Sequence, residues 1–254
     1  MSESSNDPTP RQRLDQLVAE RGLAASRARA RDAILRGHVT VDGRPVAKPS
    51  LAVSIDAVVT LNDPAADDVS RAGLKLKAAL DAFDFDVAGR TALDVGASTG
   101  GFTEVLLRRG ATHVIAVDVG HGQMHPRIAA DPRVTSIEGL NAREMTSDDI
   151  GARPFSVLVA DVSFISLRLA LPPALHLAEL GSIAAILVKP QFEAGREAIG
   201  KGGLLRDPSS AEAVAQGVGD WLAAQDGWSV LGLVPSPIEG SDGNREFLLG
   251  ARKA

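Results

Sequence analysis

The sequence predicts an α/β protein in two parts, a small α+β module followed by a larger domain built on a doubly wound, mostly parallel sheet. From Thr91 onward, apolar runs of strand length alternate with stretches of helical period. Residues 11–48 hold nine basic and four acidic side chains, whereas residues 49–254 have a net charge of −8. Residues 62–69 are rich in Asp and have no periodicity, which is typical of a linker.

The small module is predicted over residues 11–61. Leu14, Leu17 and Val18 have helical spacing within residues 11–30, and Gly22 can end that helix. The expected later elements are a helix over residues 27–36 with Ser26 as N-cap, a hairpin over residues 39–46 that turns at Asp42-Gly43, and a strand over residues 54–61.

The larger domain is predicted over residues 70–254 and begins with a helical pattern at residues 69–85. Its expected strands are residues 91–96, 113–119, 134–138, 156–161 and 183–188, with helices near 101–109, 122–129, 166–179 and 209–225. Two further strands, residues 228–235 and 246–249, are joined by a loop alone. Such a short connection favours an antiparallel pair.

The composition excludes several kinds of chemistry. The 254 residues are 44% hydrophobic and 23% charged, as in an ordinary folded protein. Cysteine is absent, so disulfides, thiolate metal sites and a cysteine nucleophile are excluded. Residues 1–10 are polar and predict a disordered tail rather than a secretory signal. The longest apolar run, Ile183–Val188, is too short to span a bilayer, so we expect a cytoplasmic protein with no membrane partner.

The turn after the first strand of the larger domain predicts a cofactor site. Its small residues are Gly96, Ser98, Thr99 and Gly100, followed by Phe102, and glycines there let the backbone approach a ligand. Neither a Gly-Lys-Ser/Thr ending nor a G-x-G-x-x-G pattern is present. Asp94 at the strand end would repel a pyrophosphate but can accept from an ammonium. S-adenosylmethionine has an ammonium, a sulfonium and no phosphate, so it is the predicted cofactor.

Later strand ends carry further polar side chains. Asp118 ends the second strand, where a carboxylate can bind ribose hydroxyls, and Asn141 follows the third strand, within reach of an adenine edge. Asp161 and Lys189 directly follow the fourth and fifth strands. Charges placed there cost stability unless they are paired or functional, and these two can neutralise each other. The histidines are scattered, and no metal is predicted.

The basic module resembles an S4 RNA-binding domain. The resemblance is carried by Arg13-Leu-Asp15, Ser26-Arg-Ala28, Ile34, Gly37 and Val39–Gly43. Arginine is suited to bidentate contact with phosphate. The arginines expected to contact RNA are Arg13, Arg27, Arg29, Arg31 and Arg36.

The larger domain resembles the FtsJ-like methyltransferases, and the whole chain resembles the TlyA family among them. The matching motifs are Ser70–Leu76, Asp94–Thr103, Ala160–Leu167, Val188–Gly195, Lys201–Asp207 and Gly243–Phe247. The resemblance implies a Rossmann-like class I methyltransferase with a seven-stranded sheet. It also implies a catalytic tetrad of Lys75, Asp161, Lys189 and Glu246, and transfer to a cytidine ribose 2′-hydroxyl of ribosomal RNA. Lys77 lies close to Lys75 and can be confused with it.

The tetrad suggests a mechanism for this reaction. A ribose 2′-hydroxyl is a weak nucleophile and must be aligned with the methyl group. We expect Lys189 to accept its proton or orient it, Asp161 to position Lys189, and Lys75 and Glu246 to hold the ribose. Two alternatives remain: a haemolysin acting on membranes, a label that TlyA-like proteins often carry, and an RNA-binding protein without catalysis. The sequence leaves the oligomeric state and the target nucleotide open.

Overall fold

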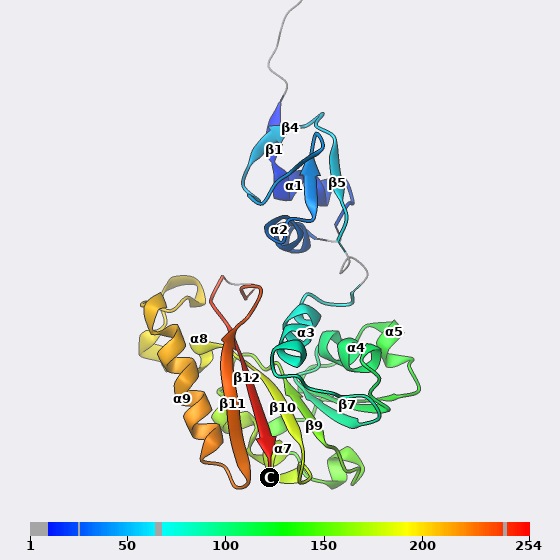
Figure 1. Cartoon of the computed structure of the whole chain (residues 1–254), viewed down its shortest axis with the longest axis vertical. Coiled ribbons are helices and arrows are strands. Elements are labelled where there is room, and N and C mark those ends of the chain that lie inside the picture. Colours follow the sequence, from blue (N-terminus) through cyan, green and yellow to red (C-terminus); the bar gives the residue numbers. More distant parts are fainter. Residues whose placement is uncertain (1–9, 25, 64–67, 241–242) are drawn as a thin grey trace, which may run out of the picture. The chain divides into compact units, whose positions relative to one another are not determined.

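The computed structural model describes residues 10–24, 26–63, 68–240 and 243–254 (Figure 1). The chain divides into two compact units, residues 1–67 and 68–254. The expected disordered tail lies outside the described residues except for Pro10, and so does the central part of the expected linker, residues 64–67.

The first unit has two short helices and five short strands. They are β1 (Arg11–Arg13), α1 (Leu14–Glu20), α2 (Arg27–Leu35), β2 (Val39–Val41), β3 (Arg44–Pro45), β4 (Ala52–Ser54) and β5 (Val59–Leu61). Leu14, Val18, Ala30 and Ile34 pack α1 and α2 into one apolar core. Helix α2 begins at the predicted cap, where the Ser26 side chain accepts from the Arg29 amide.

Two expectations for this unit were wrong in detail. Residues 11–13 are a strand rather than the start of a helix, because they pair antiparallel with residues 52–54. The single strand expected over residues 54–61 is interrupted by a turn at residues 55–58, which separates β4 from β5. The predicted hairpin is confirmed, with Asp42 and Gly43 both at positive φ (50° and 75°) between β2 and β3.

The second unit is built on a seven-stranded sheet of order β11-β12-β10-β9-β6-β7-β8. The strands are β6 (Thr91–Val95), β7 (His113–Asp118), β8 (Val134–Glu138), β9 (Val157–Ala160), β10 (Ile183–Val188), β11 (Trp228–Pro235) and β12 (Phe247–Lys253). Strands β6 to β10 are parallel to one another, and β12 runs antiparallel between β10 and β11. The predicted doubly wound sheet with a terminal antiparallel pair is confirmed.

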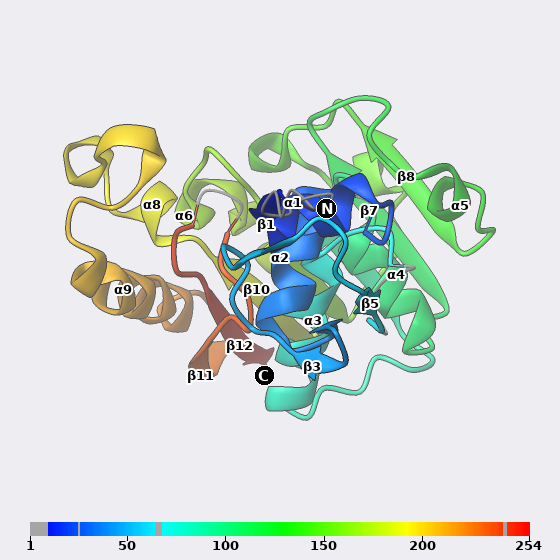
Figure 2. The same cartoon turned by 90° about the horizontal axis from the view of Figure 1, so that it is seen from above.

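Helices cover both faces of this sheet. On one face, α3 (Ala72–Ala82) and α4 (Gly101–Arg108) bury Leu76, Leu80 and Leu106. On the other face lie α6 (Leu167–Ala170), α7 (Pro172–Leu177) and α9 (Ala211–Ala223), packed through residues that include Leu171 and Leu222. Helix α9 lies beside β11 at one edge of the sheet (Figures 1 and 2), and α5 (Pro126–Ala129) lies beside β8 at the other (Figure 2).

The structure changes several predicted bounds in this unit. Helix α5 covers only the second half of residues 122–129, and the helix expected over residues 166–179 is two helices that meet at Leu171, before Pro172. A short helix, α8 (Pro190–Glu193), was not predicted. Strand β12 runs beyond Leu249, because Phe247 to Arg252 pair with all six residues of β10 and Lys253 pairs with Trp228 of β11.

The parallel strands place all their C-terminal ends along one edge of the sheet, and the loops that follow β6, β7, β9 and β10 meet there. Short 3-10 turns complete the loops, at Ala142–Glu144, Asp148–Ile150, Arg196–Ala198, Lys201–Gly203 and Pro208–Ser210. Among the residues that the structure describes, no helix combines the length and the apolarity needed to cross a membrane.

Candidate active site

The turn between β6 and α4 has backbone conformations that residues other than glycine rarely adopt. Gly96 and Gly100 have φ values of 83° and 91°, and Ser98 is also at positive φ (46°). A Cβ atom added at Gly96 would lie 2.5 Å from the carbonyl oxygen of Asp161. The Gly96 amide donates to the Val117 carbonyl at 2.8 Å. The turn is therefore drawn tightly against β7 and the loop after β9, which leaves its outer side open.

Asp118 at the end of β7 fixes the shape of this turn. Its two carboxylate oxygens accept from the backbone amides of Ser98 and Gly120, at 2.8 and 2.7 Å. The Ser98 hydroxyl donates to the Gln123 side-chain oxygen at 3.0 Å. Each carboxylate oxygen keeps a further lone pair, so Asp118 can accept a hydroxyl from a ligand without losing these contacts.

A cavity of about 550 Å³ opens beside this turn, between the ends of β7 and β9. Four of the residues predicted to bind the cofactor line it: Gly96, Ser98, Asp118 and Asn141. The Asn141 side chain also accepts from the Arg143 amide, which starts a short 3-10 turn. The structure thus brings the predicted ribose-binding and adenine-binding side chains to one cavity.

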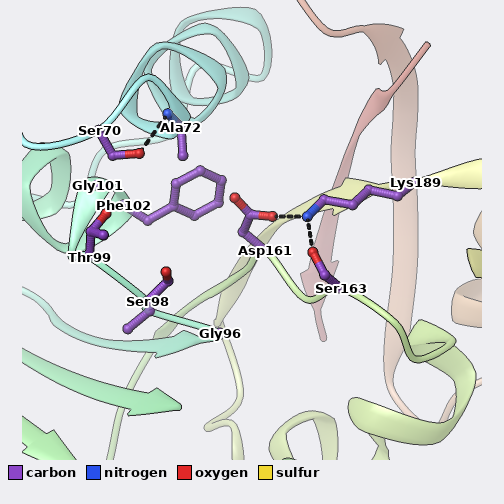
Figure 3. Close-up of a pocket in the computed structure, with 11 residues that line it drawn as sticks. Ser70, Ala72, Gly96, Ser98, Thr99, Gly101, Phe102, Asp161, Ser163 and Lys189 are labelled. Carbon is purple, nitrogen blue, oxygen red and sulfur yellow. Dashed lines mark hydrogen bonds and ion pairs between the residues drawn. The ribbon is translucent and has the colours of Figure 1, made fainter. Parts of the chain in front are cut away.

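A smaller cavity of about 150 Å³ lies on the other side of the turn (Figure 3). Its lining includes Gly96, Ser98, Thr99 and Phe102, which were all predicted to bind the cofactor, together with Asp161 and Lys189. The Lys189 Nζ atom lies 2.6 Å from Asp161 Oδ1 and donates to the Ser163 hydroxyl at 2.8 Å. Both charged side chains are mostly buried, with 11% and 15% exposed.

Lys75 and Glu246 form a second ion pair, 2.5 Å long. Lys75 lies on α3 and Glu246 directly before β12, and both side chains are at most 10% exposed. Burial raises the pKa of Glu246, and the charge and hydrogen bond of Lys75 lower it less. The charges of Lys189 and Asp161 also act on Glu246, so the four predicted tetrad residues form one electrostatic cluster. Lys77 is exposed and lies outside it.

Asp94 departs from the sequence-based expectation. Its side chain is fully buried and lines neither cavity, so it does not present an open carboxylate to a ligand. The Thr103 hydroxyl donates to its Oδ2 atom at 2.7 Å, and its Oδ1 atom has no hydrogen-bond partner in the described part of the chain. Burial raises the pKa of Asp94 to about 7.

The residues that the sequence did not identify at this site include Thr103, Gln123, Ser163 and Phe164. Phe164 is 92% exposed at a φ of 65°, and its ring centroid lies 5.1 Å from that of Phe192. Ser163 and Phe164 directly follow Asp161 and could have been found from that position alone. Thr103 and Gln123 lie inside or before helices, where the sequence gives no comparable signal.

The predicted RNA-contacting arginines all belong to the first unit. Arg13 and Arg27 are exposed and share the buried carboxylate of Asp15, at 3.0 and 2.9 Å. Arg36 forms two hydrogen bonds with Asp63, at 2.9 and 2.6 Å. Arg29 and Arg31 are half-buried. Arg13, Arg27 and Arg36 are therefore also structural residues of this unit.

The chemistry of the two cavities fits S-adenosylmethionine. The larger cavity offers Asp118 and Asn141 to an adenosine, and the smaller cavity, lined by Gly96, Ser98 and Thr99, leaves room beside the cofactor turn for the rest of the cofactor. In the described ranges, no group of three or more His, Asp or Glu side chains is arranged to hold a metal ion. The sheet order and this site define a class I methyltransferase that depends on S-adenosylmethionine.

Comparison with known families and proteins gives the particular group. The model of the FtsJ-like methyltransferases matches residues 69–253, and the model of the S4 domain matches residues 12–59. The chain belongs to the TlyA family of FtsJ-like methyltransferases. It is 46% identical over 247 residues to the 16S/23S rRNA (cytidine-2′-O)-methyltransferase TlyA of Mycobacterium tuberculosis, covering 95% of this chain and 90% of that protein.

Two further relatives agree over almost the full length. A candidate rRNA methyltransferase of Bacillus subtilis, YqxC, is 43% identical over 239 residues, which is 94% of this chain and 85% of that protein. A solved structure from Streptococcus thermophilus, described as a candidate hemolysin, is 40% identical with a TM-score of 0.72 and covers 97% of this chain and 90% of that chain. The two domains therefore occur together in these relatives.

Proposed function

We propose that this protein transfers a methyl group to the ribose 2′-hydroxyl of a cytidine in ribosomal RNA. The observation that carries the proposal is the Asp161–Lys189 pair in the wall of the cavity beside the cofactor turn. The proposal is also supported by the 46% sequence identity to a relative named as a 16S/23S rRNA (cytidine-2′-O)-methyltransferase.

The residues of the smaller cavity can prepare a hydroxyl for attack. S-adenosylmethionine, when bound, supplies an electrophilic methyl group on its sulfonium. Lys189 holds the acceptor hydroxyl in line with that group, and in its neutral amine form it can accept the hydroxyl proton. Asp161 and Ser163 each contact the Lys189 Nζ atom, at 2.6 and 2.8 Å, so they fix the direction of this side chain.

Lys75 and Glu246 act on this cluster through their charges. Neither residue lines either cavity, so we assign them to the charge balance of the cluster rather than to contact with the ribose, as expected from the sequence, or to proton transfer. A buried pair this close keeps its geometry only because both members are present, since an unpaired buried charge is costly.

The first unit supplies the RNA contact in this proposal. Its segment of residues 11–48 has a net charge of +5, and an S4 domain is matched over residues 12–59. A basic surface gives affinity for phosphates without sequence specificity, and the site then selects the nucleotide. We also infer that the protein works in the cytoplasm, where ribosomal RNA is its substrate.

Of the two alternatives, RNA binding without catalysis is disfavoured by the presence together of the cofactor turn and both ion pairs. No observation on the described residues favours action on membranes. The name hemolysin is carried by one relative above, but the features of this site are those of a transferase.

The test is methylation of ribosomal subunits that lack the modification, with purified protein and methyl-labelled S-adenosylmethionine. We expect a labelled 2′-O-methylcytidine, and mass mapping identifies its position and subunit. Lys189→Ala should lower the rate by about 100-fold or more, the usual contribution of a general base. Lys77→Ala is the control and should keep the rate. Unlabelled subunits, or full activity of Lys189→Ala with normal folding, would contradict the proposal.

A further inference from the structure

The Asp161–Lys189 pair joins two segments that leave the sheet from neighbouring strands. Asp161 is the first residue after β9, and Lys189 lies between β10 and α8. Figure 3 shows the two side chains meeting in the wall of the smaller cavity. Both segments are short and leave the sheet at this point. Contacts further along them therefore decide how firmly the pair stays aligned.

Glu193 links the same two segments four residues beyond Lys189. Its carboxylate accepts from the Ser166 hydroxyl at 2.6 Å and from the Leu167 amide at 2.7 Å. Glu193 is the last residue of α8, and Ser166 directly precedes α6, so the carboxylate joins the end of one short helix to the start of another. Figure 2 shows these two helices side by side. We refer to the two hydrogen bonds as the Glu193 clamp.

A further contact lies between the ion pair and the Glu193 clamp. The ring of Phe164 contacts that of Phe192. The contacts follow one another in the same order along both segments: Asp161 and Ser163 with Lys189, then Phe164 with Phe192, then Ser166 and Leu167 with Glu193. This order holds residues 161–167 against residues 189–193 from the cavity wall to the start of α6.

The loop after β9 needs such support. Phe164 is at a φ of 65°, in the left-handed region that is unfavourable for a residue with a Cβ atom. Its side chain is exposed, so burial offsets little of this cost. A strained residue persists when contacts around it fix the backbone. Glu193 is half-buried and uses both carboxylate oxygens on this loop, and hydrogen bonds to a charged acceptor are the stronger kind.

We propose that Glu193 is a positioning residue for methyl transfer, which keeps Asp161 and Ser163 in contact with Lys189 by holding the loop after β9 against α8. Glu193 lines neither cavity, so we assign it no contact with the cofactor or the acceptor. The inference rests on the proposed function. Methyl transfer is sensitive to such alignment, since a displacement of about 1 Å can lower a rate by about 100-fold.

Glu193→Ala tests the proposal by single-turnover methylation at saturating RNA and cofactor. We expect the rate to fall by about 10- to 100-fold, because Lys189 loses its alignment. Binding of S-adenosylhomocysteine should change by less than about threefold, since the interaction that is lost acts on the chemical step. Glu193→Gln can accept from the Leu167 amide and donate to the Ser166 hydroxyl, so it should restore most of the rate. The control is Glu212→Ala, which removes an exposed carboxylate from the first turn of α9 and should keep the rate.

Variants of Ser166 separate the Glu193 clamp from helix capping. The Ser166 side chain also accepts from the Arg168 amide at the start of α6. Ser166→Asp keeps a favourable N-cap residue, but it cannot donate to Glu193 and places a second negative charge beside it. It should lower the rate about as much as Glu193→Ala does. Ser166→Thr keeps both the donor and the cap and should keep the rate. These two variants test the clamp also if Glu193→Ala folds poorly.

The Lys189→Ala background distinguishes positioning from a general loss of structure. If the Glu193 clamp acts through Lys189, Glu193→Ala should lower the rate much less when residue 189 is already alanine. A structural defect would lower the rate by the same factor in both backgrounds. That result, or a wild-type rate in both Glu193→Ala and Ser166→Asp, would overturn the proposal. Absence of methylation by the wild-type protein would instead contradict the proposed function.

Discussion

Gly96 shows at the scale of one residue how little freedom the cofactor turn has. Gly96→Ala should destabilise the protein and abolish S-adenosylhomocysteine binding, since the added Cβ meets the Asp161 backbone at 2.5 Å. The matched control is Gly122→Ala, which has a φ of 64° and open space around it. Gly122→Ala should cost about 1–2 kcal/mol for its left-handed backbone. Gly96→Ala should cost about 1–3 kcal/mol more from overpacking. Urea unfolding measures both, and equal costs would contradict this reading.

The Lys75–Glu246 pair predicts a pH-dependent loss of stability. Lys75→Met should lower the free energy of unfolding by about 3–5 kcal/mol near neutral pH, because it leaves a buried carboxylate without its cation. Lys75 lowers the pKa of Glu246, so its removal raises that pKa further above the unfolded value. A raised folded-state pKa favours folding at low pH and loses that effect as pH rises.

The deficit of Lys75→Met should therefore be larger at pH 8 than at pH 5, where Glu246 takes up a proton. Urea unfolding of wild type and variant across this range measures it. Lys77→Met, at an exposed position on the same helix, should show almost no deficit. A deficit of Lys75→Met that stayed constant with pH would indicate lost packing rather than an unpaired charge.

At the scale of elements, the loop after β9 carries an exposed aromatic side chain that the rest of the fold does not need. Phe164 is 92% exposed, contacts Phe192 and lines the larger cavity. An aromatic ring in that position can stack on a nucleobase, which contributes about 1–3 kcal/mol per base. Phe164→Ala should therefore lower the methylation rate at limiting RNA by roughly 5- to 150-fold, the equivalent of that energy.

Binding of S-adenosylhomocysteine should change much less in Phe164→Ala than the methylation rate. The control is Leu180→Ala, an exposed apolar residue in the turn before β10, away from the cofactor turn. An unchanged methylation rate in Phe164→Ala would remove this loop from the RNA site.

For the whole molecule, the uneven charge predicts how RNA affinity responds to salt. Arg27→Gln should weaken rRNA binding and flatten its salt dependence by about one unit of log–log slope if one phosphate contact is lost. Arg13 still pairs with Asp15 in this variant, which protects the fold. Arg109→Gln, on the acidic unit and paired with Asp81, should change neither. Binding measured from low to physiological salt decides this, and equal slopes for all three proteins would contradict the role of Arg27.

The sequence by itself determined most elements of the larger domain and the chemistry at the ends of its strands. The alternation of apolar runs with helical patterns predicted the sheet, and Asp118, Asp161 and Lys189 were identified from their positions after strands, since parallel strands end at one edge. Local turn chemistry was equally readable at Asp42-Gly43 and Ser26. Lys75 and Glu246 were found through family resemblance, because no local pattern relates residues 171 positions apart.

Only the tertiary structure decided which groups are exposed, paired or buried. It placed Asp94 behind the cofactor wall, although its position at a strand end suggested an open carboxylate. It also made a strand of residues 11–13 through pairing with β4, against their expected helical state. Burial and pairing depend on contacts with residues that are distant in the sequence. Composition and periodicity describe only its neighbours in sequence.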